Sequence, residues 1–122
     1  MYYMFLIYSR EHPSALTTEQ IDELRNGHRA VMEESAQKGV LVGYAGLKPT
    51  STASAVRIQN GRPVTLDGPF AETKEQLAGY YIIDCKDLDE ALGWAARIPS
   101  KCKGSEGCIE VRPVADVPKP MV

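Results

Sequence analysis

The sequence predicts an α+β fold in which strands and helices follow the order βαββαβ, with a β-hairpin inserted between the two middle strands. Three observations lead to it. Short apolar segments rich in aromatic and β-branched residues are typical of strands. Two capped segments carry apolar residues at helical spacing. An Asn-Gly pair stands between two short strand-like runs. With 122 residues, 43% hydrophobic and 25% charged, the chain suits a single globular domain.

The first strand and the first helix follow directly from local pattern. Residues 2–8 (YYMFLIY) are apolar at both odd and even positions, which predicts a strand buried on both faces. The helix begins at Thr17 as N-cap, with Gln20 as its capping-box partner. It ends at Lys38-Gly39, because a glycine after a cation is a common helix C-terminus.

The middle of the chain contains a strand and the hairpin. Residues 40–47 (VLVGYAGL) predict a second strand that is again apolar on both faces. Residues 55–59 and 63–66 flank Asn60-Gly61, which is the strongest local hairpin signal. Together with the turn that follows, this insertion covers about residues 50–76.

The turn is Asp67-Gly68-Pro69-Phe70, a combination typical of tight turns. A polar connector over residues 71–76 follows it, with room for one helical turn. The next core strand is then predicted over residues 79–85 (GYYIIDC).

The last part of the chain supplies the second helix and the final strand. Asp87 is the predicted N-cap, with Glu90 at the third helical position, and Pro99 is expected to end the helix. Residues 107–112 predict the final strand, and residues 113–122 an extended, proline-rich tail.

Without the insertion, these elements form a ferredoxin-like βαββαβ fold with both helices on one face of an antiparallel sheet. Three of the strands are apolar on both faces, yet helices cover only one. A bare apolar sheet face would exceed the few hundred Å² usual on a monomer. A second copy is the simplest cover, so we expect a homodimer packed sheet to sheet.

Composition excludes several function classes. The net charge is −2 and no Lys/Arg run is present, so we expect no nucleic-acid or membrane partner. No segment resembles a signal peptide or approaches the roughly 18 apolar residues of a membrane span, so the expected location is the cytoplasm. Cys85, Cys102 and Cys108 lack metal-ligand spacing, and no P-loop or GxGxxG motif indicates a cofactor. Cys102 and Cys108 are either free thiols, as the cytosol favours, or a small disulfide loop.

Two residues are candidates for chemistry. His28 lies four residues after Leu24, on the helix face predicted to meet the core. It is either a core histidine satisfied by a backbone carbonyl or an acid–base group that titrates near neutral pH. Asp67 is either a turn residue that bonds its own backbone or part of a functional insertion.

Several segments together carry a resemblance to a known family. The most specific is DGPFAETKE at residues 67–75, followed by Gly79-Tyr80-Tyr81. The other matching segments are YMFLIY at residues 3–8, His28-Arg29, Gly46-Leu47, DLDEA at 87–91 and IEVRP at 109–113. Through these residues the chain resembles the YCII-related family, specifically its DGPF-domain branch.

The resemblance implies a dimeric α/β-barrel of ferredoxin-like protomers. It also implies a His–Asp acid–base pair, placed here at His28 and Asp67. Members are often encoded near extracytoplasmic-function sigma factors, which implies a link to regulation.

Two functional hypotheses follow. The first is a small-molecule enzyme of isomerase, lyase or hydrolase type without cofactor or metal, in which Asp67 orients His28. Its expected ligand-binding residues are Gly68, Pro69, Phe70, Glu72, Lys74, Tyr80 and Tyr81. The second is a non-catalytic module that senses a ligand or binds a sigma factor. Convergence of His28 and Asp67 within hydrogen-bond reach distinguishes them. A stable dimer with purely structural polar residues is the third possibility.

Overall fold

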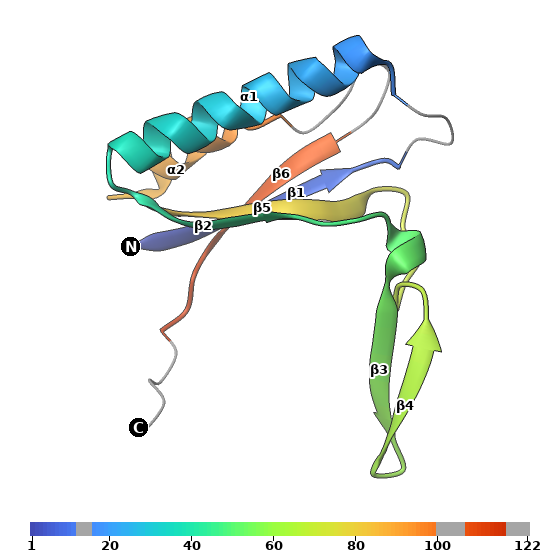
Figure 1. Ribbon diagram of the computed structural model, residues 1–122. Helices are drawn as coiled ribbons and strands as arrows, with labels where there is room; N and C mark the ends of the chain where they lie inside the picture. The colour runs from blue at the N-terminus through green and yellow to red at the C-terminus, as the bar shows by residue number, and fades with distance from the viewer. Residues whose placement is uncertain (12–15, 100–106, 117–122) are drawn as a thin grey trace.

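The computed structural model describes residues 1–11, 16–99 and 107–116. It contains six strands, two α-helices and one short 3₁₀-helix within these residues (Figure 1). In chain order they are β1 (Tyr2–Ser9), α1 (Thr18–Gln37), β2 (Leu41–Gly46), η1 (Thr50–Thr52), β3 (Ser54–Gln59), β4 (Arg62–Asp67), β5 (Gln76–Asp84), α2 (Leu88–Ala95) and β6 (Gly107–Pro113).

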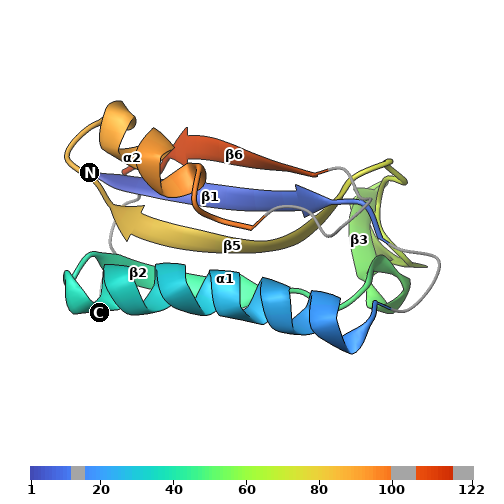
Figure 2. The ribbon, with the colours of Figure 1, turned by 90° about the horizontal axis from the view of Figure 1, so that it is seen from above.

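Four of the strands form one sheet in the order β2-β5-β1-β6. Each neighbouring pair is antiparallel. Both helices lie on the same side of this sheet, α1 along the β2 edge and α2 over β1 and β6 (Figure 2). This is the arrangement of a ferredoxin-like fold, so the predicted α+β class is confirmed.

The helices begin where their capping residues predict. The Thr17 hydroxyl accepts a hydrogen bond from the Gln20 backbone N–H at 3.1 Å, and the Gln20 side chain accepts one from the Thr17 N–H at 2.9 Å. Both bonds of the capping box are therefore present. At the start of α2, the Asp87 carboxylate accepts a hydrogen bond from the Glu90 N–H at 2.9 Å.

Two predicted boundaries are wrong. Helix α2 ends at Ala95 rather than at Pro99, since the chain turns there and buries Ile98, only 4% exposed, in the core. No helical turn forms over residues 71–76. Strand β5 instead begins at Gln76, where it pairs with the end of β1 across a β-bulge.

The core lies between the helices and one face of the sheet. Its buried side chains come from β1, β5, both helices and the segments that follow β5 and α2: Tyr3, Phe5, Ile7, Val31, Tyr81, Ile83, Cys85, Ala91, Trp94 and Ile98. The alternate residues of β1 point to the other face. No helix covers that face (Figure 1), which we call the open face, and Tyr2 on it is 48% exposed.

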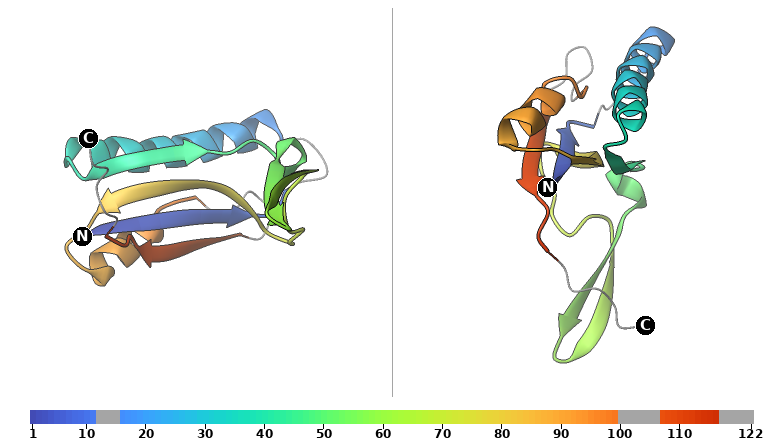
Figure 3. Two further views of the ribbon diagram at one scale, coloured as in Figure 1. Left: turned by 90° about the horizontal axis from the view of Figure 1, so that it is seen from below. Right: turned by 90° about the vertical axis from the view of Figure 1, so that its left-hand side faces the viewer.

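Strands β3 and β4 pair only with each other and form a separate two-stranded sheet. We call this hairpin, Ser54–Asp67, the arm. It extends away from the main sheet on the side opposite the helices (Figures 1 and 3). Its tip is Asn60-Gly61, with φ values of 53° and 76°. A two-residue turn of this kind needs two positive φ values, which explains the Asn-Gly pair.

Candidate functional site

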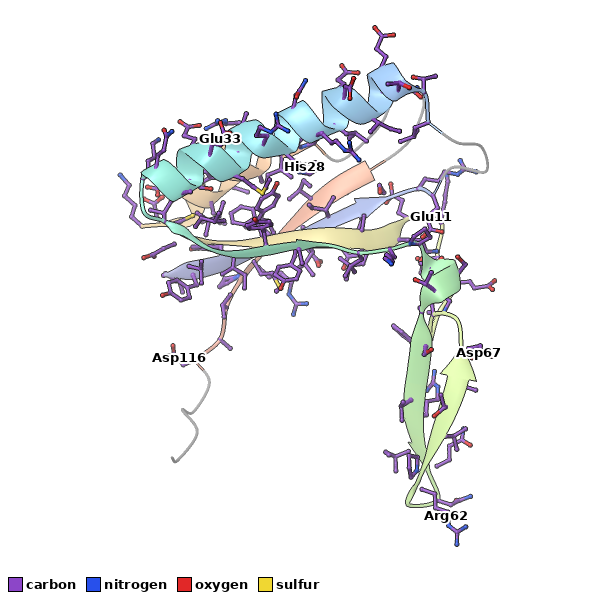
Figure 4. All side chains as sticks on the ribbon, viewed as in Figure 1. Glu11, His28, Glu33, Arg62, Asp67 and Asp116 are labelled. Atoms are coloured by element: carbon purple, nitrogen blue, oxygen red, sulfur yellow. The ribbon has the colours of Figure 1, made fainter. Side chains whose placement is uncertain are left out.

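His28 lies on the side of α1 that faces the sheet (Figure 4). Its ring nitrogen Nδ1 is 2.8 Å from the hydroxyl oxygen of Tyr81 on β5. The same hydroxyl donates a longer hydrogen bond, 3.5 Å, to the backbone carbonyl of His28. The histidine is therefore half-buried and bound through its side chain to a tyrosine of the sheet, not to a backbone carbonyl as one reading of the sequence expected.

Three aromatic rings lie in sequence from α1 to the edge of the sheet. The rings of His28 and Tyr81 are stacked, with centroids 5.9 Å apart and planes 22° from parallel. Tyr81 is followed by Tyr44 on β2 at 6.3 Å. Tyr44 is 57% exposed, so the row runs from the core to solvent.

Burial favours the neutral form of both partners in the hydrogen bond. It lowers the pKa of His28 from its usual value, because a desolvated imidazolium is disfavoured. It raises the pKa of Tyr81 to about 12, with a smaller contribution from the charge that Tyr44 would carry. Both side chains are therefore uncharged at neutral pH.

A cavity of about 270 Å³ lies beside this pair, between α1 and the strands β2 and β5. We call it the His28 cavity. Its lining contains no Asp, Glu, Lys or Arg side chain, and consists of Ile7, His28, Met32, Tyr44, Ala45, Gly46, Ala78, Gly79, Tyr80 and Tyr81. Of the two predicted ligand-binding tyrosines, Tyr81 contacts His28 through its side chain. Tyr80 also lines the cavity, but as the preceding residue of β5 its side chain points to the open face.

Asp67 lies elsewhere. It is the last residue of β4, at the base of the arm, and it is exposed. Figure 4 shows it on the opposite side of the main sheet from His28. No hydrogen bond or ion pair between the two occurs in the described part of the chain. Tyr81 therefore occupies the position at His28 Nδ1 where Asp67 was expected.

The turn after Asp67 fixes the base of the arm. Gly68 has a φ of +88°, a conformation that residues with a Cβ rarely adopt. Its N–H donates a 2.7 Å hydrogen bond to the Ala53 carbonyl, just before β3. Glu11 holds the neighbouring η1, since its carboxylate accepts hydrogen bonds from the N–H and the hydroxyl of Thr50 at 2.7 and 2.9 Å.

A second cavity, of about 560 Å³, lies at this base between the arm and the ends of β1, β2 and β5. Pro69 and Phe70 line it, but Phe70 is 76% exposed and so is not an anchor in the core. Gly68, Glu72 and Lys74 line neither cavity. The predicted ligand-binding residues are therefore divided between two places.

Sequence reasoning missed Tyr44. Its strand was expected to be buried on both faces, but β2 is the edge of the sheet and leaves the side chain beside the His28 cavity. The available signal was an aromatic residue with a polar tip in an otherwise aliphatic strand.

The remaining observations concern metal ligands, cysteines and membrane spans. No group of three or more His, Cys, Asp or Glu side chains placed to hold a metal ion occurs among them. Burial raises the pKa of the Cys85 thiol to about 11. The pairing of Cys102 with Cys108 falls outside the described residues. Among the helices described here, none has the length and apolar character to cross a membrane.

Comparisons with known proteins indicate the family of this chain. The family model described as the YCII-related domain matches residues 1–118. An uncharacterised protein of Rhizobium meliloti (strain 1021) is 42% identical over 116 residues, which cover 94% of this chain and 93% of that protein. The assignment to the DGPF branch stays a prediction. The match over almost the whole chain places this protein in the YCII-related family.

Proposed function

We propose that this protein binds a small neutral molecule in the His28 cavity and that His28 acts on it as an acid–base group without a cofactor. The observation that carries the proposal is the 2.8 Å contact between His28 Nδ1 and the Tyr81 hydroxyl at the wall of the cavity. A polar pair in a concave, mainly apolar lining is the usual form of a small-molecule site.

The hydrogen bond decides which nitrogen is available. Since Nδ1 is engaged by Tyr81, Nε2 is the ring nitrogen left for a ligand. A neutral imidazole can take a proton from one atom of a substrate and return it to another. Such an isomerisation conserves the atoms and electrons of the substrate and needs no co-reactant.

The lining indicates the kind of ligand. A charged ligand placed here would lose hydration without gaining an ionic partner, because no charged side chain lines the cavity. Its volume lies just below the usual range of roughly 300–1,000 Å³ for ligand pockets. We therefore expect a compact, uncharged molecule with a carbonyl, hydroxyl or amide group that bonds to Nε2.

Asp67 is not part of this proposed pair. The predicted His28–Asp67 pair is not made within one protomer, and Tyr81 takes over the orienting role assigned to the carboxylate. Asp67 and its turn belong instead to the base of the arm.

A thermal-shift screen of small neutral carbonyl, hydroxyl and amide compounds tests the proposal. A ligand at 100 times its Kd stabilises the native state by roughly 2.7 kcal/mol. We expect a hit with the natural chain and with Arg29→Gln, whose exposed side chain neighbours His28 in α1. We expect the shift to vanish in a folded His28→Gln variant. An equal shift in His28→Gln would contradict the proposal.

We also propose that the protein is a homodimer joined through the open face. Leu6 lies opposite Tyr80, and Met4 opposite Ile82, on this face. All four are half-buried apolar or aromatic side chains on a face that no helix covers (Figure 1). Such surfaces mark interaction sites, and two-fold dimers are the commonest assembly.

The mass in solution tests this second proposal. Light scattering should give about twice the chain mass for the natural protein and for Arg25→Gln, which changes an exposed basic residue of α1. Leu6→Glu should reduce the mass to that of one chain while the far-UV spectrum stays unchanged. A natural chain that is monomeric at all concentrations would refute the homodimer.

A further inference from the structure

The arm lacks support of its own. It is a two-stranded sheet of two six-residue strands, and neither strand pairs with the main sheet. A two-stranded hairpin alone is marginally stable at best in water. Apart from a few half-buried positions near its base and middle, its side chains are exposed. Such an element gains stability only from something packed against it.

One face of the arm is apolar. Val56 is opposite Thr65, and Ile58 is opposite Pro63, so these four side chains share a face. Val56 is 64% exposed and Ile58 is 70% exposed. These are the most exposed aliphatic β-branched side chains in the described part of the chain, and they lie in the element that is otherwise least supported.

The position of the arm matches the open face. The arm extends from the same side of the sheet as that face (Figures 1 and 3). Six residues of strand span about 20 Å, whereas two packed sheets lie about 10 Å apart. An arm of this length therefore reaches past the sheet of a second copy seated on the open face, to the side where the helices of that copy lie.

The exposed surface leaves enough area for such a contact. The chain exposes 9099 Å², whereas a compact monomer of 13.4 kDa is expected to expose roughly 6,500 Å². The excess is larger than the roughly 800 Å² that each partner buries in a standard interface. The arm, whose side chains are mostly exposed, contributes to this excess.

Charge is complementary between the arm and the helix side. Arg57 and Arg62 belong to the arm, and its one acidic residue, Asp67, lies at its base. Figure 4 shows Arg62 at the tip. Helix α1 carries four exposed acidic residues that form no ion pair with a described residue, and they outnumber its two exposed basic residues, Arg25 and Arg29. The four are Glu19, Asp22, Glu23 and Glu33.

From these observations we infer that the arm is an intersubunit clasp: the arm of each copy packs its Val56–Ile58 face on the other copy and carries Arg62 toward the acidic helix side. This inference rests on the homodimer proposed above. Two-fold symmetry lets both arms make the same contact. The cavity at the base of the arm, lined by Tyr8 and Leu77 where β1 meets β5, then borders the subunit interface.

Sedimentation equilibrium of two matched arm variants tests the clasp. Ile58→Glu puts a carboxylate on the apolar face, and Gln59→Glu puts the same group on the adjacent residue, which points to the other face. We expect Ile58→Glu to weaken dimerisation at least tenfold, and Gln59→Glu to change it less than threefold. Equal dissociation constants for the natural chain and Ile58→Glu would overturn the clasp and leave the homodimer standing.

Hydrogen exchange provides a second measurement that needs no substitution. Amides of Val56 and Thr65 should exchange at least tenfold more slowly in a concentrated dimeric sample than in a sample diluted to monomer. Identical exchange in a dimer and a monomer would overturn the clasp. A chain that is monomeric at every concentration would overturn the clasp and the homodimer together. The proposal that a ligand binds in the His28 cavity would not be affected.

Discussion

The hydroxyl of Tyr81 lies 2.8 Å from Nδ1 of His28 and joins the central strand β5 to helix α1. The two residues are 53 positions apart in the sequence. His28 is half-buried and Tyr81 is buried in the core. The pair satisfies both groups in one contact, and it leaves Nε2 as the nitrogen that can meet a ligand. Several measurable consequences follow from this geometry.

Tyr81→Phe removes the hydroxyl but keeps the ring. It leaves His28 Nδ1 without its partner in a partly buried position, so the free energy of unfolding should fall by about 1 kcal/mol. Urea denaturation measures the change. Tyr44→Phe is the matched control, since no hydrogen bond of the Tyr44 hydroxyl occurs in the described part of the chain, and it should change stability by less than half as much. Equal losses in the two variants would show that the contact contributes nothing.

Stability should depend on pH through His28. Burial lowers its pKa in the folded state below the value of about 6.5 that the unfolded chain has. Between these two values the unfolded chain binds a proton that the native state does not, so stability falls as pH decreases from about 6.5 toward the folded pKa. Above pH 6.5 this contribution is fully present.

Urea denaturation between pH 5 and pH 8 checks this sign. The natural chain should lose stability on the acid side of pH 6.5, and His28→Gln should lose less over the same interval. A steeper loss in His28→Gln would mean that the folded pKa is raised instead.

Two glycine substitutions should act in opposite directions. Gly68→Ala places a Cβ at a φ of +88° and should cost about 1–3 kcal/mol. Gly93→Ala lies within α2, where a new Cβ meets no atom within 4 Å, and should stabilise by about 0.5–1 kcal/mol. Thermal unfolding of both variants measures the difference. A neutral Gly68→Ala would mean that the base of the arm tolerates another turn.

The fold was largely predictable because its signals are local. The capping box at Thr17, the Asn60-Gly61 pair and the short apolar run of β1 each act within a few residues, and the structure has a capped helix, a tight turn and a strand at these positions. The family resemblance gave the same fold independently. The end of α2 was not predictable from local sequence. The helix ends at Ala95 because Ile98 packs into a core whose other residues come from distant parts of the sequence.

The candidate site was predictable only in part. The spacing of His28 from Leu24 placed it on the sheet-facing side of α1, as found. Its partner could not be read from the pattern, because contact with Tyr81 depends on how α1 lies across β5. Asp67 was predicted to pair with His28, but the two lie on opposite sides of the main sheet because the arm extends away from the helices (Figure 4).

The most direct test of the central claim is a ¹⁵N NMR titration of the His28 ring in the natural chain and in Tyr81→Phe. The account predicts that His28 titrates below pH 6.5, that one neutral tautomer dominates at pH 7, and that Tyr81→Phe mixes the two tautomers. A His28 that titrates at or above pH 6.5, with tautomers that do not respond to the loss of the Tyr81 hydroxyl, would contradict it.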